Sequence, residues 1–139
     1  RKTYWLVGLF AALLLGGCQM ASKPEPWGAK EVNLYAVRVL DCNGYTGSLS
    51  GPGDYNFQPN GTYYYSPAGT HRAWLRGPAG TDFDLYLWRW NGSRWVTVAS
   101  STGPTSEESL SYSGTAGYYV WRIYAYSGSG MYEFWLQRR

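Results

Sequence analysis

Short segments in which apolar and polar residues alternate recur every eight to twelve residues along most of this chain. Alternation with a period of two is typical of β-strands with one buried face, and Gly, Pro, Asn and Ser clusters between the segments indicate turns. This pattern predicts an all-β fold, a jelly-roll-like antiparallel β-sandwich of about eight strands. The segments expected as strands are residues 33–40, 45–50, 55–58, 62–66, 71–77, 83–90, 94–99, 107–112, 118–126 and 131–137.

The composition supports a sheet-rich fold and excludes one class of partner. Eight Trp, fourteen Tyr and four Phe stand beside eighteen Gly, and aromatic residues between Gly-rich turns favour strands. The formal net charge is +3, but removing Arg1 and Lys2 leaves ten basic residues against nine acidic ones. A balance of +1 does not provide the basic surface that nucleic-acid binding requires, so no nucleic-acid partner is expected.

The first residues have the pattern of an export signal. A basic start is followed by about a dozen apolar residues, which is the length of a secretory signal and too short for a spanning helix. The segment Leu15-Gly16-Gly17-Cys18 resembles the lipobox of bacterial lipoproteins. The resemblance implies that residues 1–17 are a lipoprotein signal peptide and that lipid on Cys18 anchors the chain in a membrane. An ordinary cleaved signal with an incidental cysteine is the alternative.

The remaining chain divides into a tether and one domain. Residues 18–31 contain two prolines, mixed charge and no periodicity, which indicates a flexible tether, and residues 32–139 form the predicted domain. Cys42 is then the one remaining cysteine, so an intrachain disulfide is not expected and Cys42 is interpreted as a structural residue. Gln19 follows the lipobox where Asp would signal inner-membrane retention. The lipobox rule therefore favours an outer-membrane or cell-surface location.

Turn chemistry and alternation predict pairings and faces. Asn91-Gly92 predicts a hairpin of segment 83–90 with segment 94–99, and the glycine-rich segment 126–130 predicts a hairpin joining the last two strands. Alternation then assigns an inward set of side chains: Ala73, Leu75, Phe83, Leu85, Leu87, Val96, Val98, Tyr132, Phe134 and Leu136. It assigns an outward set as well: Trp74, Asp84, Tyr86, Trp88, Trp90, Trp95 and Trp135.

Four motifs in order resemble one bacterial family. They are Gly80-Thr-Asp-Phe-Asp-Leu-Tyr-Leu87, Glu107-Glu-Ser-Leu-Ser-Tyr112, Gly117-Tyr-Tyr-Val-Trp-Arg-Ile123 and Gly128-Ser-Gly-Met-Tyr132. The series resembles the pre-peptidase C-terminal domain, which is similar to the collagen-binding modules of bacterial collagenases. The resemblance implies a jelly-roll β-sandwich. In that family the domain usually follows a secreted hydrolase, whereas here it follows the predicted lipid anchor directly.

The sequence offers little for catalysis, and we expect no enzyme and no catalytic residue. His71 is the single histidine and no serine lies in a Gly-x-Ser-x-Gly motif. A minimal hydrolase centred on His71 is the alternative.

Calcium is the one cofactor that the sequence suggests. Asp82 and Asp84 alternate onto one strand face, where both carboxylates can approach one ion, and the family resemblance implies calcium in some collagen-binding relatives. The alternative is that Asp82 accepts hydrogen bonds from turn amides and that Asp84 pairs with a cross-strand arginine or backbone. No other cofactor is expected.

The excess of aromatic residues suggests a binding surface. Trp74, Tyr86, Trp88 and Trp95 are expected on one non-core face, where flat rings bind sugar rings, peptide backbone or proline-rich chains, with Arg89 as a polar donor. The alternative is a ladder of cross-strand aromatic pairs that only stabilises the sheet. We therefore expect a non-catalytic envelope lipoprotein that binds an extracellular polymer, protein or polysaccharide, or a partner protein. A structural envelope spacer without a ligand is the second interpretation, and the sequence leaves the oligomeric state open.

Overall fold

The computed structural model describes residues 42–138, with side chains for residues 43–137. The predicted signal peptide, Cys18, the tether and the expected strand over residues 33–40 lie outside the described residues, as does the side chain of Cys42. The described part forms nine strands: β1 (Cys42–Leu49), β2 (Tyr55–Gln58), β3 (Tyr64–Ser66), β4 (Gly69–Arg76), β5 (Asp82–Trp90), β6 (Trp95–Ser101), β7 (Glu107–Gly114), β8 (Gly117–Ser127) and β9 (Gly130–Arg138).

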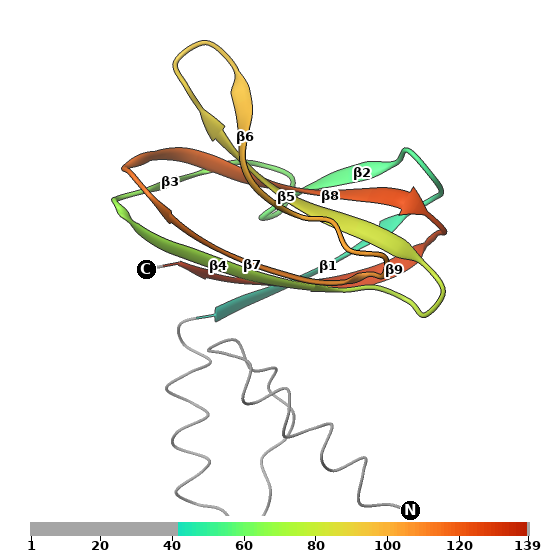
Figure 1. Ribbon diagram of the computed structural model, residues 1–139. Coiled ribbons are helices and arrows are strands. Elements are labelled where there is room, and N and C mark those ends of the chain that lie inside the picture. Colours follow the sequence, from blue (N-terminus) through green and yellow to red (C-terminus); the bar gives the residue numbers. More distant parts are fainter. Residues whose placement is uncertain (1–41, 139) are drawn as a thin grey trace, which may run out of the picture. The chain divides into compact units, whose positions relative to one another are not determined.

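The strands form two stacked sheets, which confirms the predicted β-sandwich (Figure 1). Sheet I has the order β1-β9-β4-β7, and sheet II has the order β2-β8-β5-β6, with β3 also paired to β8. The tip of the β5–β6 hairpin extends beyond the body of sheet II (Figure 1). Within residues 42–138 there is no helix of sufficient length and hydropathy to cross a membrane.

The core lies between the sheets, where the alternation placed it. Phe83, Leu85 and Leu87 of β5 are fully buried, and Phe134 and Leu136 of β9 face them from the other sheet. Each buried aliphatic or aromatic side chain of this size stabilises the fold by about 1.5–3 kcal/mol. The buried cluster consists of Leu49, Tyr64, Ala73, Leu75, Phe83, Leu85, Leu87, Tyr119, Trp121, Ile123, Ala125, Tyr132, Phe134 and Leu136.

One polar contact joins the two sheets through this core. The Tyr132 hydroxyl of β9 accepts a hydrogen bond from Gln58 Nε2 at 2.9 Å and donates one to Asn56 Oδ1 at 2.8 Å, both on β2. Gly47 of β1 lies against the same hydroxyl, and a Cβ there would come within 2.3 Å of it. The close approach of β1 to Tyr132 therefore requires glycine.

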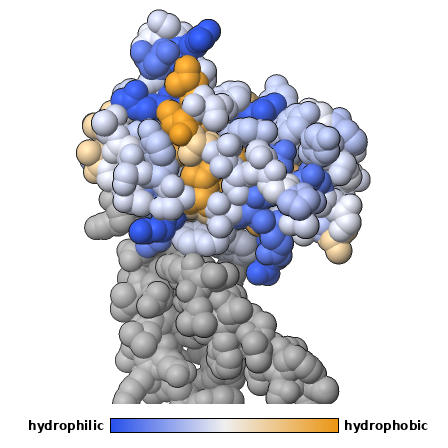
Figure 2. Space-filling model, in the orientation of Figure 1, coloured by the Kyte–Doolittle hydropathy of each residue, from blue (hydrophilic) through white to orange (hydrophobic). Residues whose placement is uncertain are grey.

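The predicted β5–β6 hairpin is confirmed. Trp90 pairs with Trp95, and Asn91 N donates to Arg94 O at 3.0 Å to close the turn. A bulge between Leu87 and Trp88 shifts the register of β6. Val96 and Val98, both expected inward, are both partly buried; Val98 packs against the core cluster, and Val96 pairs with Arg89. Figure 2 shows a short band of apolar side chains on the surface below this hairpin.

The hairpin predicted for the last two strands is wrong. Strand β8 belongs to sheet II and β9 to sheet I, so the connection crosses from one sheet to the other. Gly128 and Gly130 have φ values of 85° and 141°, and a Cβ on either would lie 2.7 Å from Thr81 or Pro78. The glycines thus allow the crossing segment to pack closely on the β4–β5 loop. Trp135 lies on the side of β9 opposite Phe134 and Leu136, as expected, but it is only 7% exposed.

Candidate functional site

Aromatic side chains cover the outer surface of sheet II, and one arginine lies among them. Arg122 of β8 pairs with Phe57 of β2 on one side and with Tyr86 of β5 on the other. Its guanidinium carbon lies near the centres of four rings, at 4.7 Å for Tyr55, 4.8 Å for Tyr124, 5.4 Å for Trp88 and 5.7 Å for Tyr86. These distances are within the range of cation–π attraction. We call this surface, formed by Tyr55, Phe57, Tyr86, Trp88, Arg122 and Tyr124, the aromatic face.

A hollow opens beside the aromatic face at the β5–β6 hairpin. It has a volume of about 460 Å³ and is lined by Tyr63, Trp90, Trp95 and Tyr118. The Tyr63 ring centre lies 5.8 Å from that of Trp95 and 5.7 Å from that of Tyr118, and Trp90 lies 5.4 Å from Trp95. Tyr63, Tyr118 and Trp90 remain 55%, 47% and 37% exposed. In this aromatic hollow the rings hold each other in place by packing. Part of their surface remains exposed, so a ligand can reach it.

The structure brings together part of the predicted aromatic set. Tyr86, Trp88 and Trp95 lie on the outer side of sheet II as expected. Trp74 does not join them, because β4 belongs to sheet I, where Trp74 pairs with Trp135 and Ser109. The expectation of one shared face for Trp74 and the other three residues is therefore wrong.

Arg89, the predicted polar donor of the aromatic surface, also lies away from the aromatic face, so this prediction is wrong. It pairs with Tyr119, its guanidinium carbon lies 5.8 Å from the Tyr119 ring centre, and its Nη2 donates to Ala116 O at 2.8 Å. Alternation from Leu87 puts residue 89 on the inward side of β5. The arginine of the aromatic face is Arg122, which sequence reasoning missed. The signal that could have found it is alternation, because Arg122 stands between Trp121 and Ile123, which are both fully buried.

A second cluster, at the other end of β5, consists of carboxylates. Ligand atoms of Asp82, Asp84 and Glu108 all lie within 4.8 Å of one another. Asp84 is 6% exposed and Glu108 is 7% exposed. Burial raises the pKa of Asp84 to about 6, and the negative charges of Asp82 and Glu108 add to the rise. We call these three residues the acidic cluster.

The acidic cluster forms where β6 ends. Ser101, the last residue of β6, pairs with Leu85, so the first residues of β5 have the 102–106 loop as their neighbour at this edge. Ser106 Oγ accepts a hydrogen bond from Phe83 N at 2.8 Å and lies 2.6 Å from Thr81 Oγ1. Ser106 thus satisfies the amide at the start of β5. Turn amides donating to Asp82 were the alternative to calcium, and Asp82 Oδ1 is buried without a hydrogen-bond partner among the described residues.

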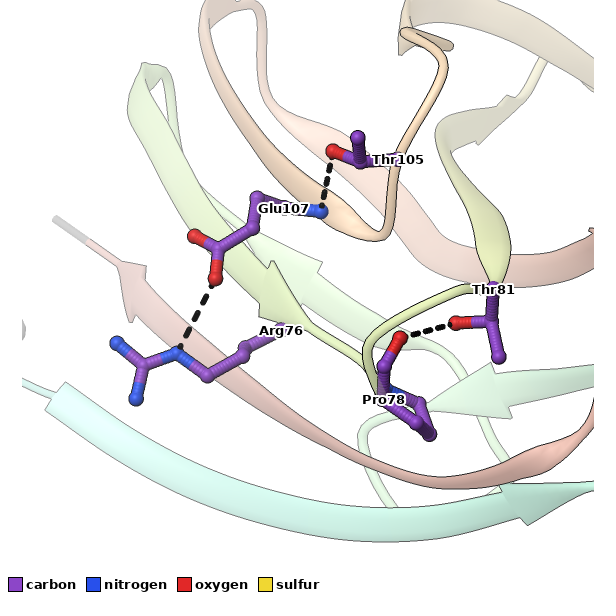
Figure 3. Close-up of polar contacts among 5 residues, drawn as sticks. All are labelled: Arg76, Pro78, Thr81, Thr105 and Glu107. Atoms are coloured by element: carbon purple, nitrogen blue, oxygen red, sulfur yellow. Dashed lines mark hydrogen bonds and ion pairs between the residues drawn. The ribbon is translucent and has the colours of Figure 1, made fainter.

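Neighbouring contacts fix the loops on both sides of the acidic cluster. Thr81 Oγ1 donates to the Pro78 carbonyl at 2.7 Å, and Thr105 Oγ1 accepts from Glu107 N at 3.2 Å. Figure 3 shows both contacts. The Glu107 carboxylate lies 3.6 Å from Arg76 Nε, with both side chains mostly exposed. Glu107 therefore occupies the exposed side of β7, whereas the next residue, Glu108, is buried.

His71 lies in the core and is 1% exposed. Its Nδ1 is 2.8 Å from the Tyr64 hydroxyl, which also accepts a hydrogen bond from Trp121 Nε1 at 3.0 Å. The Tyr119 ring centre lies 4.2 Å from that of His71. A general base must reach a substrate, and a histidine enclosed by aromatic side chains is poorly placed for that role.

The fold defines a small all-β domain of the sandwich class, with aromatic side chains on the outer surface of one sheet. No protein-family model matches the chain. Among solved structures, it is similar to the mitogen of Yersinia pseudotuberculosis, with 20% sequence identity, 70% of this chain and 86% of that chain covered, and a TM-score of 0.55. It is also similar to the pre-peptidase C-terminal domain of collagenase from Bacillus anthracis, with 17% identity, 66% and 85% covered, and a TM-score of 0.54. The fold implied by the motif resemblance is therefore confirmed.

Proposed function

We propose that this chain is a non-catalytic binding module of the bacterial envelope that recognises an extracellular polymer, protein or polysaccharide, through sheet II. The observation that carries the proposal is the aromatic hollow beside the aromatic face. Its four rings offer stacking surface in a concave site, which is the arrangement that binds sugar rings or extended peptide. The similarity to a collagenase pre-peptidase C-terminal domain supports a protein ligand as the first class to test.

The exposure of the rings differs between the centre of the outer surface of sheet II and its edge at the β5–β6 hairpin. This difference favours a binding role over an aromatic ladder that only stabilises the sheet. At the centre, Arg122 is surrounded by rings, and Phe57 and Trp88 are 5.6 Å apart and only partly exposed. At the hairpin edge, Tyr63 and Tyr118 expose about half of their surface. A ladder that served stability alone would gain nothing from leaving these rings open to water.

Binding arrays test this proposal directly. The full chain, purified in detergent, is applied to arrays of glycans and fibrous proteins, collagen included, and compared with Trp95→Ala. Loss of this ring is expected to weaken binding at least tenfold, as for aromatic residues at the centre of interfaces. Trp74→Ala, a tryptophan of sheet I, is the matched control and should bind as the wild type does.

Two results would contradict the proposal. If the wild-type chain binds nothing on the arrays, the structural-spacer function is favoured. If Trp74→Ala weakens binding as much as Trp95→Ala while both variants retain the wild-type unfolding temperature, the ligand does not use the aromatic hollow.

Lipid attachment at Cys18 would hold this module at an outer membrane or cell surface. Support comes from the sequence pattern of residues 1–18, since more than one acyl chain is needed for stable anchoring and lipoproteins carry two or three. The same preparation provides the test. Wild-type chain should fractionate with membranes and carry acyl groups on Cys18 by mass spectrometry, and Cys18→Ser should carry none.

A further inference from the structure

We propose that Asp82, Asp84 and Glu108 form a calcium site that joins the two sheets. Asp82 and Asp84 lie on β5 of sheet II and Glu108 lies on β7 of sheet I, so the carboxylates come from both layers of the sandwich. Two oxygen ligands on opposite sides of one calcium ion are about 4.6–5.2 Å apart, which is twice the usual calcium–oxygen distance. Separations within 4.8 Å therefore fit a shared ion.

Unsatisfied buried oxygens point to a missing positive partner. Among residues 42–138, Asp82 Oδ1, Asp84 Oδ1 and Glu108 Oε2 are buried and accept no hydrogen bond. The other Glu108 oxygen, Oε1, accepts from Ser101 Oγ. A buried carboxylate oxygen without a donor is costly, by about 1–3 kcal/mol or more for a charged group. A divalent cation would satisfy all three oxygens at once.

The surroundings suit a hard cation with several oxygen ligands. The cluster borders a hollow of about 540 Å³ that is lined by Thr102, Gly103 and Pro104 of the β6–β7 loop and by Tyr86 and Tyr126. Gly103 of that loop lies beside the Glu108 carboxylate, because a Cβ there would be in ordinary contact with Oε2 at 3.4 Å. Loop carbonyls and water can complete the six to eight ligands that calcium takes, whereas zinc favours sulfur and nitrogen ligands that the cluster does not contain.

The adjacent residues Glu107 and Glu108 provide a matched pair of variants for testing the calcium site. The full chain is stripped with EDTA, and thermal unfolding and isothermal titration are followed with CaCl₂ for wild type, Glu108→Gln and Glu107→Gln. Wild type should bind one calcium ion with a Kd of about 10⁻⁴–10⁻³ M, the range of extracellular modules, and its unfolding temperature should rise with calcium. Glu107→Gln, which changes the exposed neighbour, should respond as wild type does.

Glu108→Gln separates loss of the site from loss of the fold. This variant removes one of three crowded charges, so its unfolding temperature in EDTA should equal or exceed that of wild type, while its calcium affinity should fall at least tenfold. Terbium luminescence gives a second readout, because Tyr86 and Tyr126 line the same hollow as Asp82 and Asp84 and tyrosine sensitises bound terbium.

Three results would overturn the proposal. They are no saturable calcium binding below 10 mM, an equal response of Glu107→Gln and Glu108→Gln, or an equal rise in unfolding temperature with MgCl₂. Ligand binding at the aromatic hollow is measured separately, so failure of the calcium site leaves the proposed function standing.

Discussion

Replacing Arg122 by methionine tests how much the positive charge among the rings of the aromatic face contributes to the stability of the domain. Methionine keeps an apolar stem of similar length, so the change removes mainly the guanidinium group. Four ring centres lie 4.7–5.7 Å from that group. Each such contact stabilises by about 0.5–1 kcal/mol at exposed sites, and contacts that share one charge do not add fully. We therefore expect the free energy of unfolding to fall by about 1–2 kcal/mol.

Urea unfolding followed by tryptophan fluorescence measures this difference, because Trp88 reports on the same surface. For a domain of this size the loss corresponds to an unfolding temperature lower by about 5–15 °C. Arg94→Met is the control, since Arg94 is exposed in the β5–β6 turn, and it should change the stability by less than about 0.5 kcal/mol. A stability of Arg122→Met equal to that of Arg94→Met would refute the cation–π account of this surface.

Two further substitutions test the polar contacts of the fold. Tyr132→Phe leaves the buried Gln58 amide without its acceptor, so urea unfolding should show a loss of about 1–3 kcal/mol, whereas Tyr65→Phe, at an exposed ring, should show almost none. Hydrogen bonds from the Ser50 amide and hydroxyl hold the pKa of Asp54 below its usual value of 3.8. The stabilising effect of this lowered pKa is present above about pH 4 and is lost as the pH falls through the folded-state pKa. Asp54→Asn should therefore be less stable than wild type at pH 7, and urea unfolding at pH 3 and below should show the gap closing; a gap that stays constant with pH would contradict this account.

The strands were predictable because they depend on local chemistry. Strand β2 has the expected limits, and Asn91-Gly92 closes the β5–β6 hairpin as its turn preference predicts. The path of the segment from Ser127 to Gly130 could not be predicted from local chemistry. A glycine-rich turn suits both a hairpin and a crossing between sheets, and which strand β9 pairs with depends on the whole sandwich.

The candidate sites show the same division between local and non-local information. Alternation along β5 placed Tyr86 and Trp88 outward correctly, and the same rule, extended by two residues from Leu87, puts Arg89 inward. The position of Trp74 depends on which sheet contains β4, and the sequence pattern does not encode that. Glu108 joins Asp84 although 24 positions separate them, because the β6–β7 loop returns the chain to the open edge of β5.

Strand β5 connects the two surfaces, and its length makes them separable. Asp84 and Trp90 are six residues apart on the same side of the strand, which corresponds to about 20 Å. The aromatic hollow is open to solvent, and about 20 Å is more than twice the screening length of about 8 Å at physiological ionic strength, so even a cation at the buried Asp84 exerts only a small direct force on a ligand there. Any effect of calcium on ligand binding must therefore pass through the packing of β5 itself.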